Sequence, residues 1–251
     1  DKEFESEQEF YDANSPIFDG LVHKYYTSIV HSKYREQLEK KWGKQLFDVA
    51  EVTLRTFSPE ILEDLKKENE LRTDYSKLLA SAKIFFDGEE KNLQGLIPYM
   101  ESTDRDLRKA ANEAKWKFFS DNEEEFDRLY DELVKIRARM AKKLGYKNFV
   151  QMGYDRMGRT DYNSEMVKKF RDQVLETIVP IAVKLKQKQQ NRLGLESFKY
   201  YDQPLDYKSG NAKPHGSPDW IVSCAKNMYS ELSPETNEFF NFMLDNEMMD
   251  L

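Results

Sequence analysis

Two arginines and a tyrosine lie close together in the middle of the chain, in the sequence YDRMGRTDY at positions 154–162. They are Arg156, Arg159 and Tyr162. A guanidinium group can donate two parallel hydrogen bonds to a carboxylate, and a phenol can both donate and accept one. A plain connection between helices is typically built from Gly, Pro, Ser and Asn instead.

This cluster has two interpretations. In the structural one, the arginines pair with Asp155, Asp161 or helix carbonyls and hold two helices together, because packed polar groups need partners. In the functional one, Arg156, Arg159 and Tyr162 form part of the wall of a substrate channel and bind a peptide backbone or carboxylate.

The sequence contains no set of residues at the spacing that a catalytic metal site requires. The three histidines are His23, His31 and His215, and the first two are eight residues apart, which is too far for the HExxH pairing of zinc peptidases. No histidine follows a glutamate at the Glu-x-x-His spacing of carboxylate di-metal bundles. We therefore expect this chain to bind no zinc and to hold no catalytic residue of its own.

Other reactive groups favour structural roles. Cys224 lies at helical spacing between Ile221 and Met228, which predicts a buried structural thiol. The many acids next to bases, as in NEEEFDRLYDELVK, predict a solvated helix face whose charges pair with one another.

The elements that position these residues are predicted to be helices. Apolar residues recur at helical spacing, most regularly from Phe126 to Leu144, where Gly145 predicts a left-handed end. Asp104 and Asp121 are predicted N-caps. Serine followed by proline is typical of a helix start, and this pair occurs at 15–16, 58–59, 217–218 and 233–234.

The second half of the chain carries three further features. A long helix is predicted from residue 164, with a kink near Thr177 because Pro180 removes an amide. Residues 195–218 are predicted to form a loop. The last helix is apolar on more than one face, which predicts that other parts of a larger protein cover it; its apolar residues are Phe239, Phe240, Phe242, Met243, Leu244, Met248, Met249 and Leu251.

One short segment departs from the helical period. The run KIFFDGEEK at 83–91 has an Asp-Gly turn between a β-prone stretch and a polar one. The sequence therefore predicts an all-α fold with one small β-hairpin near 83–92.

Several motifs together resemble the oligoendopeptidase F family of thimet oligopeptidase-like zinc peptidases. They are ASAKIFFDGE at 80–89, KKLGYKNF at 142–149, YDRMGRTDY at 154–162 and ELSPET at 231–236. In that family the catalytic HExxH follows the position that corresponds to Leu251. The resemblance implies a fragment of a zinc enzyme that cleaves short peptides, with a helical N-terminal region at 1–160 and the start of the peptidase domain at 161–251. It also implies a catalytic C-terminal half as partner.

The composition is typical of a soluble, folded protein. The 251 residues are 39% hydrophobic and 34% charged, which is enough for a packed core. A net charge of −7 argues against a nucleic-acid partner. No apolar run is long enough for a membrane, and the acidic start together with a single cysteine favours the cytoplasm.

The alternative is a non-catalytic helical scaffold or protein-interaction module. The sequence that follows Leu251 discriminates the two hypotheses, since an HExxH motif there supports the peptidase and a stop codon supports the module.

Overall fold

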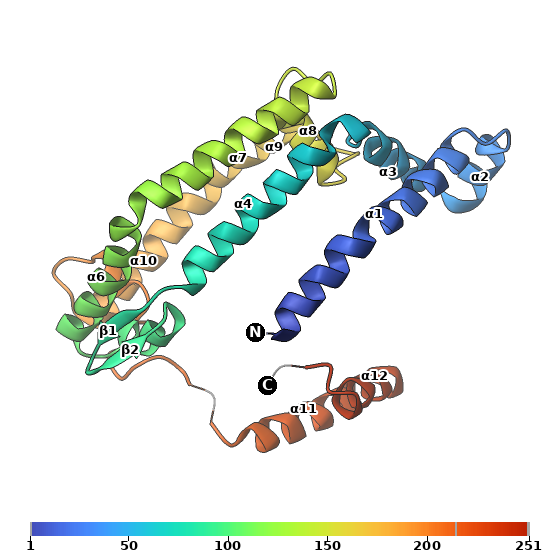
Figure 1. The fold of residues 1–251 in the computed structure, drawn as a ribbon. Helices are drawn as coiled ribbons and strands as arrows, with labels where there is room; N and C mark the ends of the chain where they lie inside the picture. The colour runs from blue at the N-terminus through green and yellow to red at the C-terminus, as the bar shows by residue number, and fades with distance from the viewer. Residues whose placement is uncertain (1, 214, 250–251) are drawn as a thin grey trace.

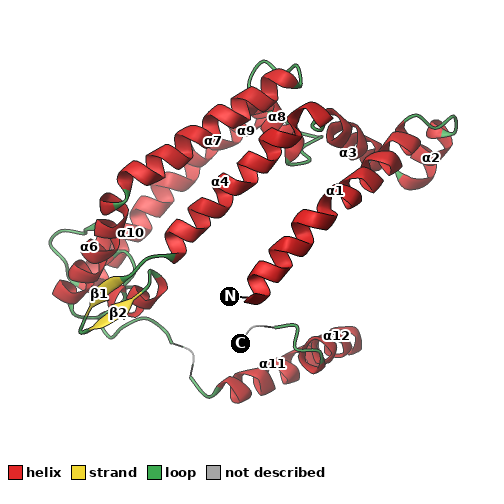
Figure 2. Cartoon of the chain, in the orientation of Figure 1, coloured by secondary structure: helices red, strands yellow, loops and turns green. Residues whose placement is uncertain are grey.

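A computed structural model describes residues 2–213 and 215–249. The chain is mostly helical, with one two-stranded sheet (Figures 1 and 2), as predicted. In chain order the elements are α1 (Lys2–Val30), α2 (Arg35–Trp42), α3 (Lys44–Arg55), η1 (Pro59–Ile61), α4 (Leu62–Ala80), β1 (Ile84–Phe86), β2 (Glu89–Lys91), η2 (Gln94–Leu96), α5 (Ile97–Met100), α6 (Arg105–Asp121), α7 (Glu123–Lys143), α8 (Phe149–Arg156), α9 (Ser164–Gln173), η3 (Val174–Ile178), α10 (Val179–Leu193), η4 (Tyr200–Asp202), α11 (Pro218–Leu232) and α12 (Pro234–Asp245).

The core lies between the antiparallel helices α4 and α7. One buried cluster joins Leu71 of α4 to Leu129 and Ile136 of α7. A second cluster closes the end of this pair, where α8 also packs; its buried members are Ile61, Met140, Ala141 and Met152. These two clusters fix the position of α8, and therefore the start of the segment that carries the candidate site.

Most of the predicted helix ends are confirmed. The side chains of Ser58, Ser217 and Ser233 each accept a hydrogen bond from a first-turn amide. Asp104 caps α6 in the same way. Gly145 has a φ of +79°, and the amide of Tyr146 donates to the carbonyl of Ala141, which is the hydrogen bond of a left-handed helix end.

Two predicted starts are wrong. Helix α1 runs without interruption through Ser15-Pro16, because the helix is already formed before the proline and continues past the one amide that proline removes. Asp121 is the last residue of α6, and Asn122 is the junction from which α7 begins. Two helices that follow each other so closely leave no separate capping position at Asp121.

The hairpin is confirmed. Strands β1 and β2 pair antiparallel with Phe86 opposite Glu89 (yellow in Figure 2). The turn between them is Asp87-Gly88, with φ values of +53° and +81°. Positive φ at both central residues is the geometry for which an Asp-Gly pair is favoured.

The long helix is confirmed from Ser164 to Leu193 and contains a π-helical turn, η3, which ends two residues before Pro180. The π turn is how the helix accommodates the missing proline amide. The loop that follows contains one 3-10 turn, η4, in which Asp202 is fully buried and paired with Arg105 and Arg108 of α6. These ion pairs anchor the loop to α6.

Helices α11 and α12 pack on each other and stand apart from the α4–α7 pair in Figure 1. Cys224, predicted to be buried, is exposed, because α12 covers only one side of α11. Helix α12 ends at Asp245, earlier than the apolar pattern suggested, with Glu247 in the left-handed region. Met248 therefore follows the helix, and Leu251 lies outside the described residues.

Candidate functional site

The candidate site is the connection between α8 and α9, residues 157–163. Gly158 ends α8 with a φ of +65°, and the amide of Arg159 donates to the carbonyl of Tyr154 at 3.1 Å. The side chain of Asn163 then caps α9 by accepting from the amides of Glu165 and Met166. Both ends of the connection are thus fixed by hydrogen bonds to helix termini.

A side-chain contact with α3 fixes the middle of this α8–α9 connection. The amide of Gln45 on α3 donates to the hydroxyl of Thr160 at 3.0 Å. The connection is therefore tied to a helix more than a hundred residues away in sequence, as well as to its two neighbours.

Arg156, the last residue of α8, pairs with a residue of α4. Its guanidinium donates to both carboxylate oxygens of Glu68, at 3.3 and 2.8 Å. Arg137 of α7 donates to the same carboxylate at 2.6 Å. Glu68 is only 2% exposed, so the group that joins α4, α7 and α8 is a buried carboxylate held by two arginines.

The electrostatics of Glu68 follow from this arrangement. Burial raises the pKa of its carboxyl, but the hydrogen bonds and charges of Arg156 and Arg137 outweigh burial and leave the pKa below its ordinary value. The carboxylate is therefore ionised at neutral pH, as its two arginine partners require.

Asp155 forms a second polar centre on α8. Its carboxylate accepts hydrogen bonds from Arg55, Tyr146 and Gln151 at 3.0, 2.7 and 2.8 Å. Burial, followed by the hydrogen bond to Asp155, raises the pKa of Tyr146 to about 12. Asp155 is thus already provided with donors from α3, α8 and the α7–α8 turn.

Arg159 has different surroundings. Its guanidinium carbon lies 5.0 Å from the ring centre of Tyr154 and 5.5 Å from that of Tyr162, and the two rings meet edge to face at 6.5 Å. Within the part of the chain that the structure describes, no acidic side chain forms an ion pair with it. Arg159 is held by aromatic faces and keeps its N–H edges available.

An open hollow of about 370 Å³ lies beside Arg159. Its other lining residues are Tyr162, Met166, Val167 and Phe170. The structure therefore brings Arg159 and Tyr162 together and separates Arg156 from them. Tyr154 and the apolar residues of α9 are not among the candidate site residues predicted from the sequence, although the spacing of Met166 and Phe170 does place them on one helix face.

The described residues do not suit a metal ion. Across 2–213 and 215–249, no three side chains of His, Cys, Asp or Glu come together as ligands. His31 contacts the carbonyl of Thr27, His23 lies against Phe57, and His215 lies against Trp220.

Over the same described residues, 2–213 and 215–249, no helix combines the length and apolar character that crossing a membrane requires.

The comparisons with known proteins agree with the fold. The sequence matches the Peptidase M3 N-terminal domain over residues 1–57 and Peptidase family M3 over residues 98–215. The chain belongs to the M3 peptidase family, to its oligoendopeptidase F-like members. No match is found among curated proteins.

Three solved structures are similar over the whole of this chain. One described as PZ peptidase A with an inhibitor is 56% identical with a TM-score of 0.94, and this chain covers 45% of it. A putative oligoendopeptidase F is 51% identical with a TM-score of 0.94 and 44% covered. Another, from Bacillus anthracis str. Ames, is 53% identical with a TM-score of 0.91 and 46% covered. The chain thus spans less than half the length of each.

Proposed function

We propose that this chain is part of a zinc-dependent oligoendopeptidase that hydrolyses internal bonds of short peptides. The observation that carries the proposal is identity of 51% to 56%, over the whole chain, with solved structures of which two are described as putative oligoendopeptidase F. The HExxH motif and the zinc are proposed to belong to polypeptide outside these 251 residues. The division of the chain into regions 1–160 and 161–251 stays a prediction.

In this proposal the chain supplies scaffold and part of a channel wall. Arg159 and Tyr162 are assigned to the wall, because they border an open hollow and keep hydrogen-bonding capacity. Arg156 is assigned to support of the wall, because its guanidinium is engaged with Glu68. The bound zinc would polarise a peptide carbonyl and activate water, and no step of that chemistry is assigned to the residues described here.

The proposed partners are short peptides and the catalytic C-terminal half of the enzyme. Net charge of −7 disfavours nucleic acid as a partner. One cysteine in 251 residues, exposed and without a disulfide, is in keeping with the reducing environment of the cytoplasm.

The test is expression of the gene with the sequence that follows Leu251. We expect an HExxH motif there, zinc-dependent cleavage of fluorogenic peptides by the longer protein, and loss of that cleavage on chelation. The 251-residue chain alone should bind no stoichiometric zinc and cleave nothing. A stop codon after Leu251, or a zinc-loaded longer protein that cleaves no peptide, would contradict the proposal and favour a non-catalytic module.

A further inference from the structure

We infer that Arg159, Tyr154, Tyr162 and the hollow beside them form a subsite for a peptide carboxylate that lies next to an apolar side chain. The inference rests on the proposed function for its ligand class, which is a short peptide. It goes further by naming the group that is recognised and the residue that recognises it.

The first step of the argument is how Arg159 is held. The helix end at Gly158 turns the backbone so that the amide of Arg159 bonds back to Tyr154, and this same turn places the guanidinium against the Tyr154 ring. The Tyr162 ring contacts the guanidinium as well. A cation positioned by two aromatic rings loses little further freedom when it binds an anion, which favours affinity.

The second step is the charge around Arg159. The nearby acid Asp155 already accepts three hydrogen bonds from other residues, and Glu68 is paired with Arg156 and Arg137. Among the described residues that line the hollow, Arg159 is also the single charged one. In the part of the chain that the structure describes, the hollow therefore presents one positive charge and no carboxylate, and a planar carboxylate matches the donor geometry of guanidinium.

The third step is the lining of the hollow. Met166, Val167 and Phe170 provide an apolar surface on α9, one side of which is open to solvent. A volume of about 370 Å³ falls within the range of small-ligand pockets, and few convergent polar groups on an apolar surface are typical of them. An apolar side chain next to the carboxylate would cover this surface.

The carboxylate has two sources, the C-terminus of a peptide or an acidic side chain. Binding to the 251-residue chain distinguishes them without any catalysis. The probes are N-acetyl-Gly-Leu with a free C-terminus, its C-terminal amide, and the pair N-acetyl-Glu-Leu-amide and N-acetyl-Gln-Leu-amide. The readout is the nuclear magnetic resonance shift of the Tyr162 backbone amide during titration, because wild type and every variant retain this group next to residue 159.

We expect the free acid to bind and its amide to bind at least about tenfold more weakly, as loss of a charge-assisted hydrogen bond predicts. A similar preference for the Glu peptide over the Gln peptide would assign the site to any carboxylate, and its absence would assign the site to the C-terminus. Arg159→Gln should abolish the preference for the acid, and Arg159→Lys should retain part of it, since lysine keeps the charge without the paired donors.

Arg171→Gln is the matched control, because Arg171 is an exposed arginine of α9 outside the hollow. It should leave the preference unchanged. Equal binding of acid and amide, or equal losses in Arg159→Gln and Arg171→Gln, would overturn the subsite. If the longer protein cleaves no peptide while this chain still prefers the acid, the proposed function fails and the subsite stands; the opposite pair of results rejects the subsite alone.

Discussion

Arg156 on α8 donates one hydrogen bond to each carboxylate oxygen of Glu68 on α4, although the two residues are 88 positions apart. Arg137 of α7 completes the group. Three helices therefore share one buried charge, and the removal of a single partner leaves that charge incompletely compensated.

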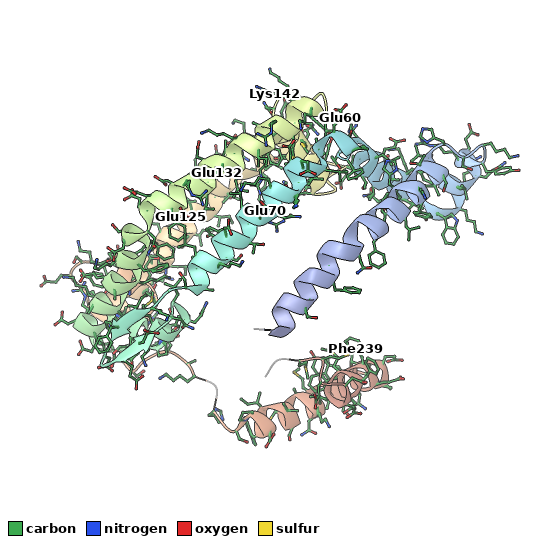
Figure 3. All side chains as sticks on the ribbon, viewed as in Figure 1. Glu60, Glu70, Glu125, Glu132, Lys142 and Phe239 are labelled. Atoms are coloured by element: carbon green, nitrogen blue, oxygen red, sulfur yellow. The ribbon has the colours of Figure 1, made fainter. Side chains whose placement is uncertain are left out.

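We predict that Arg156→Ala lowers the free energy of unfolding by about 1 to 3 kcal/mol. The reason is that Glu68 loses one of its two arginines while it remains buried. The matched control is Arg128→Ala, which removes an arginine paired with Glu125 and Glu132 on the exposed face of α7 (Figure 3) and should destabilise the chain less than Arg156→Ala does. Urea unfolding measures both, and equal losses in the two variants would show that the buried group adds nothing.

A second prediction concerns pH and Asp202. Burial raises the pKa of this carboxyl, but hydrogen bonds from Arg105, the amide of Lys199 and Arg108 outweigh burial and leave the pKa below the ordinary value of 3.8. Because the unfolded chain binds this proton more tightly, the stabilisation is fully present above the unfolded pKa and is lost as pH falls below about 3.8 towards the folded pKa.

Unfolding of the wild type should therefore become easier as the pH falls below about 4, and Asp202→Asn should flatten this dependence while lowering stability at pH 7. Asp172→Asn serves as the control, since Asp172 belongs to an exposed pair with Lys168 on α9. An unchanged slope in Asp202→Asn would mean that the buried group does not contribute to acid unfolding.

The third prediction concerns the hairpin turn. Gly88 has a φ of +81°, which an L-residue with a Cβ adopts only with strain, so Gly88→Ala should destabilise the chain by about 1 kcal/mol. Gly20 lies within α1 at an ordinary helical φ with open space around it, and Gly20→Ala should stabilise by about 0.5 to 1 kcal/mol. Urea unfolding of both variants measures the change in the free energy of unfolding. Changes of opposite sign for the same Gly→Ala substitution would distinguish backbone strain at Gly88 from helix propensity at Gly20.

Local signals in the sequence predicted much of this fold. Asp87-Gly88 and the caps Ser58, Ser217 and Ser233 depend only on residues a few positions away, and all are confirmed. Ser15-Pro16 shows the limit of such signals, because the same dipeptide is tolerated inside a helix that has already formed.

The candidate site depends on contacts that no local pattern contains. The sequence indicated that Arg156 needs a partner and offered Asp155, Asp161 or helix carbonyls, while the partner is Glu68 on another helix. Burial of Cys224 was predicted from helical spacing, which shows which residues share a face and not whether anything covers it. The partner of Arg156 and the exposure of Cys224 both depend on how helices that are distant in the sequence pack together.

The last prediction concerns the apolar surface of α12. Phe239 (labelled in Figure 3) and Phe242 are 64% and 54% exposed, whereas Phe240 is 8% exposed and stacks on Tyr229 of α11 with ring centres 4.5 Å apart. Exposed aromatic side chains on one short helix are typical of a surface that another polypeptide covers. In the proposed enzyme, the catalytic half would cover them.

We therefore expect the isolated chain to self-associate through α12 as its concentration rises and to bind a hydrophobic dye. Phe239→Asp combined with Phe242→Asp should weaken both effects while leaving the helical circular dichroism unchanged. Phe240→Asp is not a suitable test, because it places a charge against Tyr229 in the contact between α11 and α12. Leu21→Asp on α1 changes a similarly exposed residue elsewhere and should have little effect on association. Sedimentation at several protein concentrations measures self-association. A strict monomer that binds no dye would show that this surface is stable in water. That result would remove the physical reason for expecting a partner to cover α12.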